Sequence, residues 1–90
     1  MAFIVGVGEG DFDAFERQFD QDPLGRKPAA KGHFLMRGVD NPNEVFVGIE
    51  FATAEEAQSF AEKVRNSTVL QNMIVKVPPT ATEIADQATY

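Results

Sequence analysis

The only histidine of this 90-residue chain is His33, and imidazole is the side-chain type suited to acid–base chemistry near neutral pH. His33 begins an apolar segment, residues 33–39, and a second apolar segment, residues 44–51, contains the carboxylate of Glu50. Residues 40–43 are all turn formers, so the two segments are expected to pair as a β-hairpin. With an even number of residues in the turn, His33 lies opposite Glu50. A carboxylate beside an imidazole favours the protonated imidazole, which predicts that Glu50 tunes His33 as a base.

The same register predicts one wall of a small-molecule site. It places Leu35 opposite Gly48 and Arg37 opposite Phe46, and alternate residues of a strand share a face. Gly48 leaves room for a ligand, while Phe46 and Leu35 supply apolar walls, the usual composition of such a site. The candidate ligand-binding residues are therefore His33, Leu35, Arg37, Phe46 and Glu50.

A purely structural interpretation of the hairpin stays open. His33 and Glu50 can form a cross-strand pair worth about 0.5 kcal/mol that supports the hairpin or a dimer contact. A turn with an odd number of residues shifts the register by one and separates the pair.

Composition excludes several classes of chemistry. Without cysteine the chain has no disulfide, thiolate metal site or cysteine nucleophile, and one histidine argues against an imidazole metal site. We expect no metal and no cofactor. Eight basic against 14 acidic residues give a net charge of −6, which disfavours nucleic acid. No apolar run is long enough to span a membrane, and the first apolar run lacks the basic flank of a signal peptide, so we expect a cytoplasmic protein.

Two further motifs have structural interpretations. Gly6-x-Gly8-x-Gly10 follows a strand but lacks the spacing of a dinucleotide-binding loop, so we interpret it as a flexible connection. Residues 23–31 combine Pro, Gly and basic residues and predict a solvated loop, with Gly25-Arg26-Lys27 and Lys31 contacting an anion as the alternative.

The elements that position these residues follow from periodicity. Residues 3–7 predict a strand buried on both faces, and residues 11–19 a helix, with Asp13 and Glu16 as its capping box and Pro23 beyond its end. Three phenylalanines of that helix form one stripe, interpreted as core or as the roof of a pocket: Phe12, Phe15 and Phe19.

The second half of the chain predicts a further helix and strand. Thr53 and Glu56 form a capping box for a helix that extends to Val64. Residues 68–74 predict a short helical segment, and residues 80–85 a last strand beyond two prolines. Three residues of this half are interpreted first as core and second as pocket lining: Phe60, Leu70 and Met73.

The resulting order, βαββαβ, predicts one ferredoxin-like α+β domain over residues 1–90. It consists of a four-stranded antiparallel sheet with both helices on one face. The strands of residues 3–7 and 44–51 carry apolar residues on both faces: Phe3, Val5 and Val7 oppose Ile4, and Val45, Val47, Ile49 and Phe51 oppose Phe46. The uncovered face is therefore too apolar to remain in water. Burial of about 700 Å² would contribute roughly 15–20 kcal/mol before association costs. We therefore expect a homodimer; a monomer with scattered surface apolar residues is the alternative.

The chain also resembles a known family. Residues 40–47, continued through residues 50–57, and the helix of residues 11–19 are similar to the dimeric α+β barrel superfamily, in particular its antibiotic-biosynthesis-monooxygenase-like and cyclase-like small proteins. The resemblance covers residues 2–85 and implies two sheets packed face to face, with a pocket between helices and sheet. Family members include cofactor-free quinol oxygenases, haem-degrading enzymes and polyketide cyclases.

The resemblance transfers no catalytic residue. The chain lacks the tryptophan on which the oxygenases often rely, and His33 is on a predicted strand, whereas the haem ligand is on a helix. Two functions stay open. One is a binder of a small apolar or aromatic metabolite, extending to a cofactor-independent monooxygenase-like or cyclase-like enzyme. The other is a non-catalytic structural or regulatory dimer.

Overall fold

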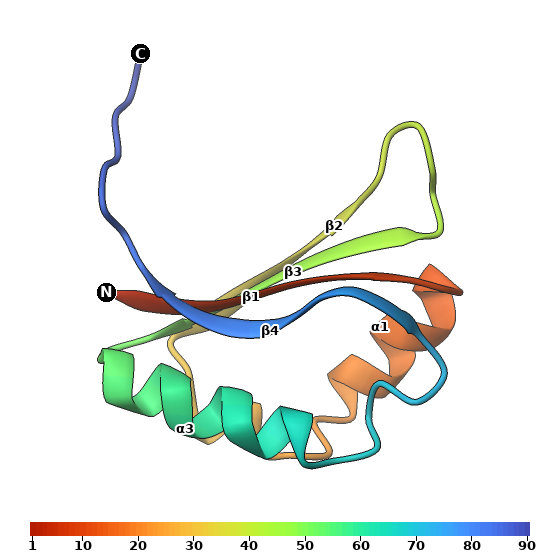
Figure 1. Cartoon of the computed structure of the whole chain (residues 1–90), viewed down its shortest axis with the longest axis horizontal. Coiled ribbons are helices and arrows are strands. Elements are labelled where there is room, and N and C mark those ends of the chain that lie inside the picture. The colour runs from red at the N-terminus through yellow and green to blue at the C-terminus, as the bar shows by residue number, and fades with distance from the viewer.

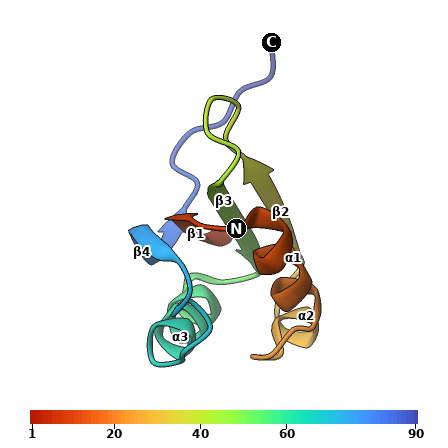
Figure 2. The ribbon, with the colours of Figure 1, turned by 90° about the vertical axis from the view of Figure 1, so that its right-hand side faces the viewer.

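The computed structural model describes all 90 residues and places four strands in one antiparallel sheet, in the order β2-β3-β1-β4. The strands are β1 (Ala2–Glu9), β2 (Gly32–Arg37), β3 (Glu44–Phe51) and β4 (Ile74–Glu83). The helices are α1 (Phe12–Asp20), α2 (Arg26–Ala29) and α3 (Ala54–Arg65). All helices lie on one side of the sheet (Figures 1 and 2). The ferredoxin-like α+β fold is therefore confirmed.

Helix α3 packs against the sheet, and the core lies between them. Its predicted cap is confirmed, because the Thr53 hydroxyl accepts from the Glu56 amide at 3.2 Å. Phe51 of β3 is 0% exposed, and its ring centroid lies 5.5 Å from that of Phe60. The buried cluster consists of Ala2, Ile4, Ile49, Phe51, Ala57, Phe60 and Ala61. The small alanines of α3 allow close packing on β1 and β3.

Helix α1 differs from its prediction. Its cap is Asp11, which accepts from the Ala14 amide at 3.1 Å, and Asp13 lies within the first turn. The reason is that Phe12 is already the first helical residue, so the capping position is the one before it. The helix buries no residue completely, and its three phenylalanines are half-buried: Phe12, Phe15 and Phe19. The stripe is therefore not a closed core.

The β2–β3 hairpin has a different register from the predicted one. Arg37 pairs with Val45, and the Gly38 amide donates to the Glu44 carbonyl at 2.9 Å, so the connection spans five residues, 39–43. This odd number shifts the pairing by one residue. The carbonyl and side chain of Asn41 accept from the Glu44 and Asn43 amides, which fixes the turn.

Strand β4 is longer than predicted and begins earlier. It runs from Ile74 through Pro78 and Pro79, and residues 68–73 form turns where a helical segment was expected. The prolines are tolerated because β4 is an edge strand that pairs only with β1, and the register shifts between Val5 and Val7. Ile74, expected to end the helical segment, is the first residue of β4 and is 65% exposed.

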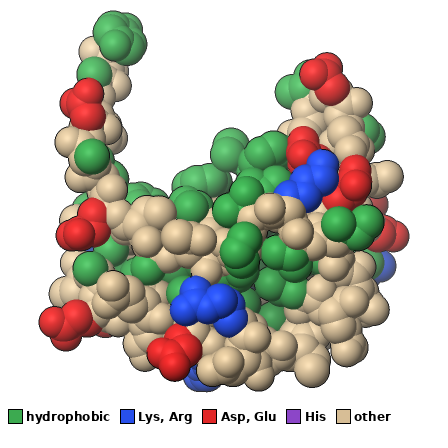
Figure 3. All heavy atoms as spheres, in the orientation of Figure 1, with side chains coloured by type: hydrophobic (Ala, Val, Ile, Leu, Met, Phe, Trp, Pro, Cys, Tyr) green, Lys and Arg blue, Asp and Glu red, His purple; other side chains and the backbone are tan.

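The side of the sheet away from the helices is apolar. We call it the open face and define it by Phe3, Val5, Phe34, Met36 and Phe46, which share one side in the observed register. Met36 is 51% exposed in the single chain. The β2–β3 hairpin and the segment after β4 both rise on this side (Figure 1), and hydrophobic side chains gather between them (Figure 3). β1 is thus fully buried only on its helix side.

Candidate functional site

The predicted site residues fall on two sides of the sheet. His33 pairs with Ile49, which is buried under the helices, whereas Glu50 pairs with Gly32 and belongs to the other side. The predicted pairing of His33 with Glu50 is therefore wrong, because the five-residue turn shifts the register. His33, Leu35 and Arg37 lie on the helix side, and Phe46 and Glu50 on the open face. A ligand-binding role for these residues stays a prediction.

On the helix side, two of the predicted residues contact α1. The ring of His33 meets Phe19 edge-on, with 4.8 Å between centroids. The guanidinium of Arg37 lies 4.2 Å from the Phe12 ring centroid and donates to Asp13 at 3.1 Å. These contacts fix α1 beside β2, which is a structural role.

An apolar cavity lies between the helices and the sheet. It has a volume of about 110 Å³ and is lined by 22 residues, of which 15 are hydrophobic. The sheet, both long helices and the turns before β4 contribute the larger apolar side chains: Ile4, Val45, Val47, Ile49, Phe15, Phe19, Phe60, Val64, Leu70 and Met73. None of the five predicted ligand-binding residues lines it. The pocket-lining interpretation of Phe15, Phe19, Phe60, Leu70 and Met73 agrees with the structure.

Arg26 is the one cationic side chain in the cavity lining. It is only 4% exposed, its guanidinium carbon lies 3.6 Å from the Phe19 ring centroid, and Nη1 donates to the Phe19 carbonyl at 2.9 Å. Nη2 is buried and has no acceptor. The predicted solvated basic loop is therefore wrong at residues 26–29, which form α2, and Arg26 is buried; Lys27 and Lys31 are exposed as predicted.

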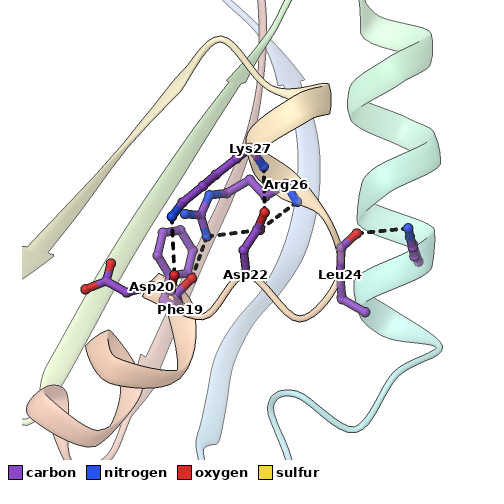
Figure 4. A network of polar contacts seen from close by, with 7 residues as sticks. Phe19, Asp20, Asp22, Leu24, Arg26 and Lys27 are labelled. Carbon is purple, nitrogen blue, oxygen red and sulfur yellow. Dashed lines mark hydrogen bonds and ion pairs between the residues drawn. The ribbon is translucent and has the colours of Figure 1, made fainter.

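Asp22 holds Arg26 in place through the backbone. Its carboxylate accepts from the amides of Arg26 at 2.6 Å and Lys27 at 3.0 Å, which caps α2, and lies 3.8 Å from Arg26 Nη1 (Figure 4). The residue has a φ of 54°, a left-handed conformation that aspartate tolerates better than most residues. The hydrogen bond from the Lys27 amide, aided by the Arg26 amide and both positive charges, lowers the pKa of Asp22 below its ordinary 3.8.

Two lysines donate hydrogen bonds to carbonyl groups of the connection around Asp22. Lys27 Nζ donates to the carbonyl of Asp20 at 3.3 Å, and Lys63 of α3 donates to the carbonyl of Leu24 at 2.9 Å (Figure 4). The second bond joins α3 to the connection between α1 and α2. The cavity lies between these elements, so this hydrogen bond links the α3 side of the cavity to the α1 side.

The capping carboxylate predicts a pH dependence. Folding lowers the pKa of Asp22, so the ionised carboxylate stabilises the folded state at any pH above the pKa of the unfolded chain. This stabilisation is lost as the pH falls through the lower pKa of the folded state. We expect Asp22→Asn to unfold at a lower temperature than the unchanged protein at pH 7, and the difference to shrink below about pH 3.8. Thermal unfolding followed by circular dichroism between pH 7 and pH 2.5 measures it. Asp20→Asn, which removes a neighbouring exposed carboxylate, should show no such trend. If the difference in unfolding temperature between Asp22→Asn and the unchanged protein does not depend on pH, the ionised Asp22 carboxylate does not stabilise the fold.

The arrangement favours binding of apolar molecules over metal chemistry. No cluster of three or more His, Cys, Asp or Glu side chains is placed to hold a metal ion. The polar side chains of the lining are Gln18, Asp22 and Arg26. No helix combines the length and the apolar character that a membrane crossing requires. Sequence reasoning missed Arg26 as a buried residue; its spacing of four from Asp22, typical of a helical ion pair, was the available signal.

Comparison with known proteins agrees with the fold. No protein-family model and no curated protein matches the chain. Among solved structures, a crystal structure of a protein from Deinococcus radiodurans, provisionally assigned as an antibiotic biosynthesis monooxygenase, matches with a TM-score of 0.67. The match covers 100% of this chain and 98% of that one, at 8% sequence identity. The resemblance to this group is confirmed at the level of the fold: the chain is a ferredoxin-like α+β protein.

Proposed function

We propose that the chain functions as a homodimer whose two open faces pack against each other. The open face supports the proposal, because its aromatic and aliphatic side chains, on the edge strand β2 and the central strands β3 and β1, are partly exposed in the single chain. A contiguous apolar surface of this kind marks an interaction site. The two rising segments at its edges leave it accessible to a second, identical curved sheet (Figure 1).

Light scattering coupled to size-exclusion chromatography tests this part of the proposal. The expected mass is about twice the 9.9 kDa of one chain at micromolar concentration. A mass of one chain at every concentration overturns it.

We further propose that each subunit binds a small apolar or aromatic molecule in the cavity between helices and sheet. The single observation that carries this is the cavity, a pre-formed apolar space of about 110 Å³ with few polar groups. Apolar cavities of about this size admit a molecule of one aromatic ring. A cytoplasmic location belongs to the same proposal and rests on the sequence.

Binding without catalysis is the favoured form of this function. Of the polar side chains in the lining, only Asp22 can accept a proton, and its carboxylate is occupied by two backbone amides. A cofactor-independent monooxygenase-like or cyclase-like enzyme is the second candidate. It is supported by the assignment of the Deinococcus radiodurans protein and by the apolar interior that such chemistry needs.

Filling the cavity should weaken binding. Val64 of α3 lines the cavity and is half-buried, so Val64→Phe places additional ring atoms in the space that a ligand would occupy. We expect the affinity for toluene, measured by NMR titration, to fall by about tenfold or more. Val39→Phe adds the same ring at a position that is 98% exposed and should leave the affinity unchanged. Equal affinities of the two variants would place the toluene elsewhere.

A further inference from the structure

The guanidinium of Arg26 has an unmet hydrogen-bonding capacity inside the cavity wall. Of its two terminal nitrogens, Nη1 donates to the Phe19 carbonyl at 2.9 Å, whereas Nη2 is buried without any acceptor. Buried donors are nearly always paired in folded proteins, and a charged donor is the costliest to leave unpaired. Arg26 is one of the residues that line the apolar cavity, so a molecule in the cavity that displaces its guanidinium slightly would supply the missing acceptor.

The charge of Arg26 is only partly balanced by the protein. The nearest carboxylate, Asp22, is 3.8 Å from Nη1, beyond hydrogen-bond distance, and accepts from two backbone amides instead. Lys27 adds a second positive charge in the same segment. An anionic acceptor at Nη2 would complete the balance, because a carboxylate forms strong, directional bonds with a guanidinium.

Arg26 is also held at the cavity wall, by a ring contact and a backbone hydrogen bond, before any ligand arrives. Its guanidinium stacks on the Phe19 ring at 3.6 Å, and its backbone amide is held by Asp22 at 2.6 Å (Figure 4). A pre-positioned polar group pays little entropy on binding. The same Phe19 ring lines the cavity, so the polar group and an apolar wall are in contact with each other.

We propose that the cavity takes a small aromatic carboxylate whose carboxylate oxygen accepts from Arg26 Nη2 and whose ring occupies the apolar space. This inference rests on the proposed binding function and names its ligand class. The volume of about 110 Å³ limits the body to about one ring, and the apolar lining selects a body without further polar groups. Nη2 has no exposed surface in this arrangement, so the bond requires the guanidinium to turn slightly, while the stack on Phe19 and the backbone bond to Asp22 keep the residue at the cavity wall.

Paired titrations of benzoate and toluene test the inference. Toluene has the same ring and no carboxylate, so it reports the cavity alone. We expect Arg26→Met to weaken benzoate binding by roughly 10- to 100-fold, the usual effect of losing a charge-assisted hydrogen bond. Toluene binding should change by less than about threefold. Lys27→Met removes the adjacent, exposed charge and should leave the benzoate affinity within the same threefold.

A second measurement keeps the test independent of whether Arg26→Met folds. In the unchanged protein, benzoate should shift the side-chain guanidinium NMR signals of Arg26, and toluene should shift the surrounding methyl signals alone. If toluene binds but benzoate neither shifts Arg26 nor depends on it, the carboxylate inference is overturned and the apolar cavity function stands. If neither molecule binds, the proposed cavity function fails and the inference with it.

Discussion

Replacing Phe46 with lysine is expected to dissociate the proposed homodimer into monomers of 9.9 kDa. Phe46 lies on the open face between Met36 and Val7, on the central strand β3. In a symmetric dimer the variant would bury two ammonium groups in an apolar contact, at a cost of about 4 kcal/mol or more. The dissociation constant should therefore rise about 1,000-fold or more, which sedimentation equilibrium measures directly.

The matched control introduces the same charge away from the open face. Val39 is 98% exposed in the β2–β3 turn, so Val39→Lys should leave the dissociation constant unchanged. Circular dichroism of both variants shows whether each chain is folded. A folded Phe46→Lys variant that still has the mass of a dimer would show that the subunits do not meet through this face.

Phe51→Ala should cause the largest loss of stability among single core substitutions. The side chain is 0% exposed and packs against Phe60 in the buried cluster between α3 and the sheet. Truncating such a ring costs about 3–5 kcal/mol, through lost apolar burial and the cavity left behind. A domain of this size has a total stability of about 5–10 kcal/mol, so the variant should be close to unfolding.

Urea unfolding at fixed protein concentration measures this loss, since dimer formation would make the stability depend on concentration. Tyr90→Ala, at the exposed end of the chain, should change the stability by less than about 0.5 kcal/mol. A Phe51→Ala variant within 1 kcal/mol of the unchanged protein, on the order of an exposed substitution, would contradict the position of the core.

The sequence predicts the fold well where the pattern is local. β3 runs over Glu44–Phe51 as its alternating residues indicate, and α3 begins after Thr53 as its capping box indicates. Both are long, strongly periodic elements with clear boundaries. The order of the elements then determines the sheet, because few topologies satisfy the rules for short, right-handed connections.

The candidate site was less predictable because it depends on tertiary detail. The turn at 39–43 has five residues, one more than the predicted four-residue turn. This one-residue shift places His33 and Glu50 on different sides of the sheet. β4 continues through two prolines because it is an edge strand, which its own sequence does not reveal. Arg26 is buried by its stack on Phe19 and its carbonyl bond, contacts between segments that composition alone does not predict.

The packing of two open faces is tested most directly by NMR on a mixture of isotope-labelled and unlabelled chains. Filtered nuclear Overhauser spectra of this mixture report contacts between subunits only. We expect contacts from the rings of Phe3, Phe34 and Phe46 on one subunit to the methyl groups of Val5 and Met36 on the other. The absence of such contacts, or their restriction to residues of α1 or α3, would contradict this packing.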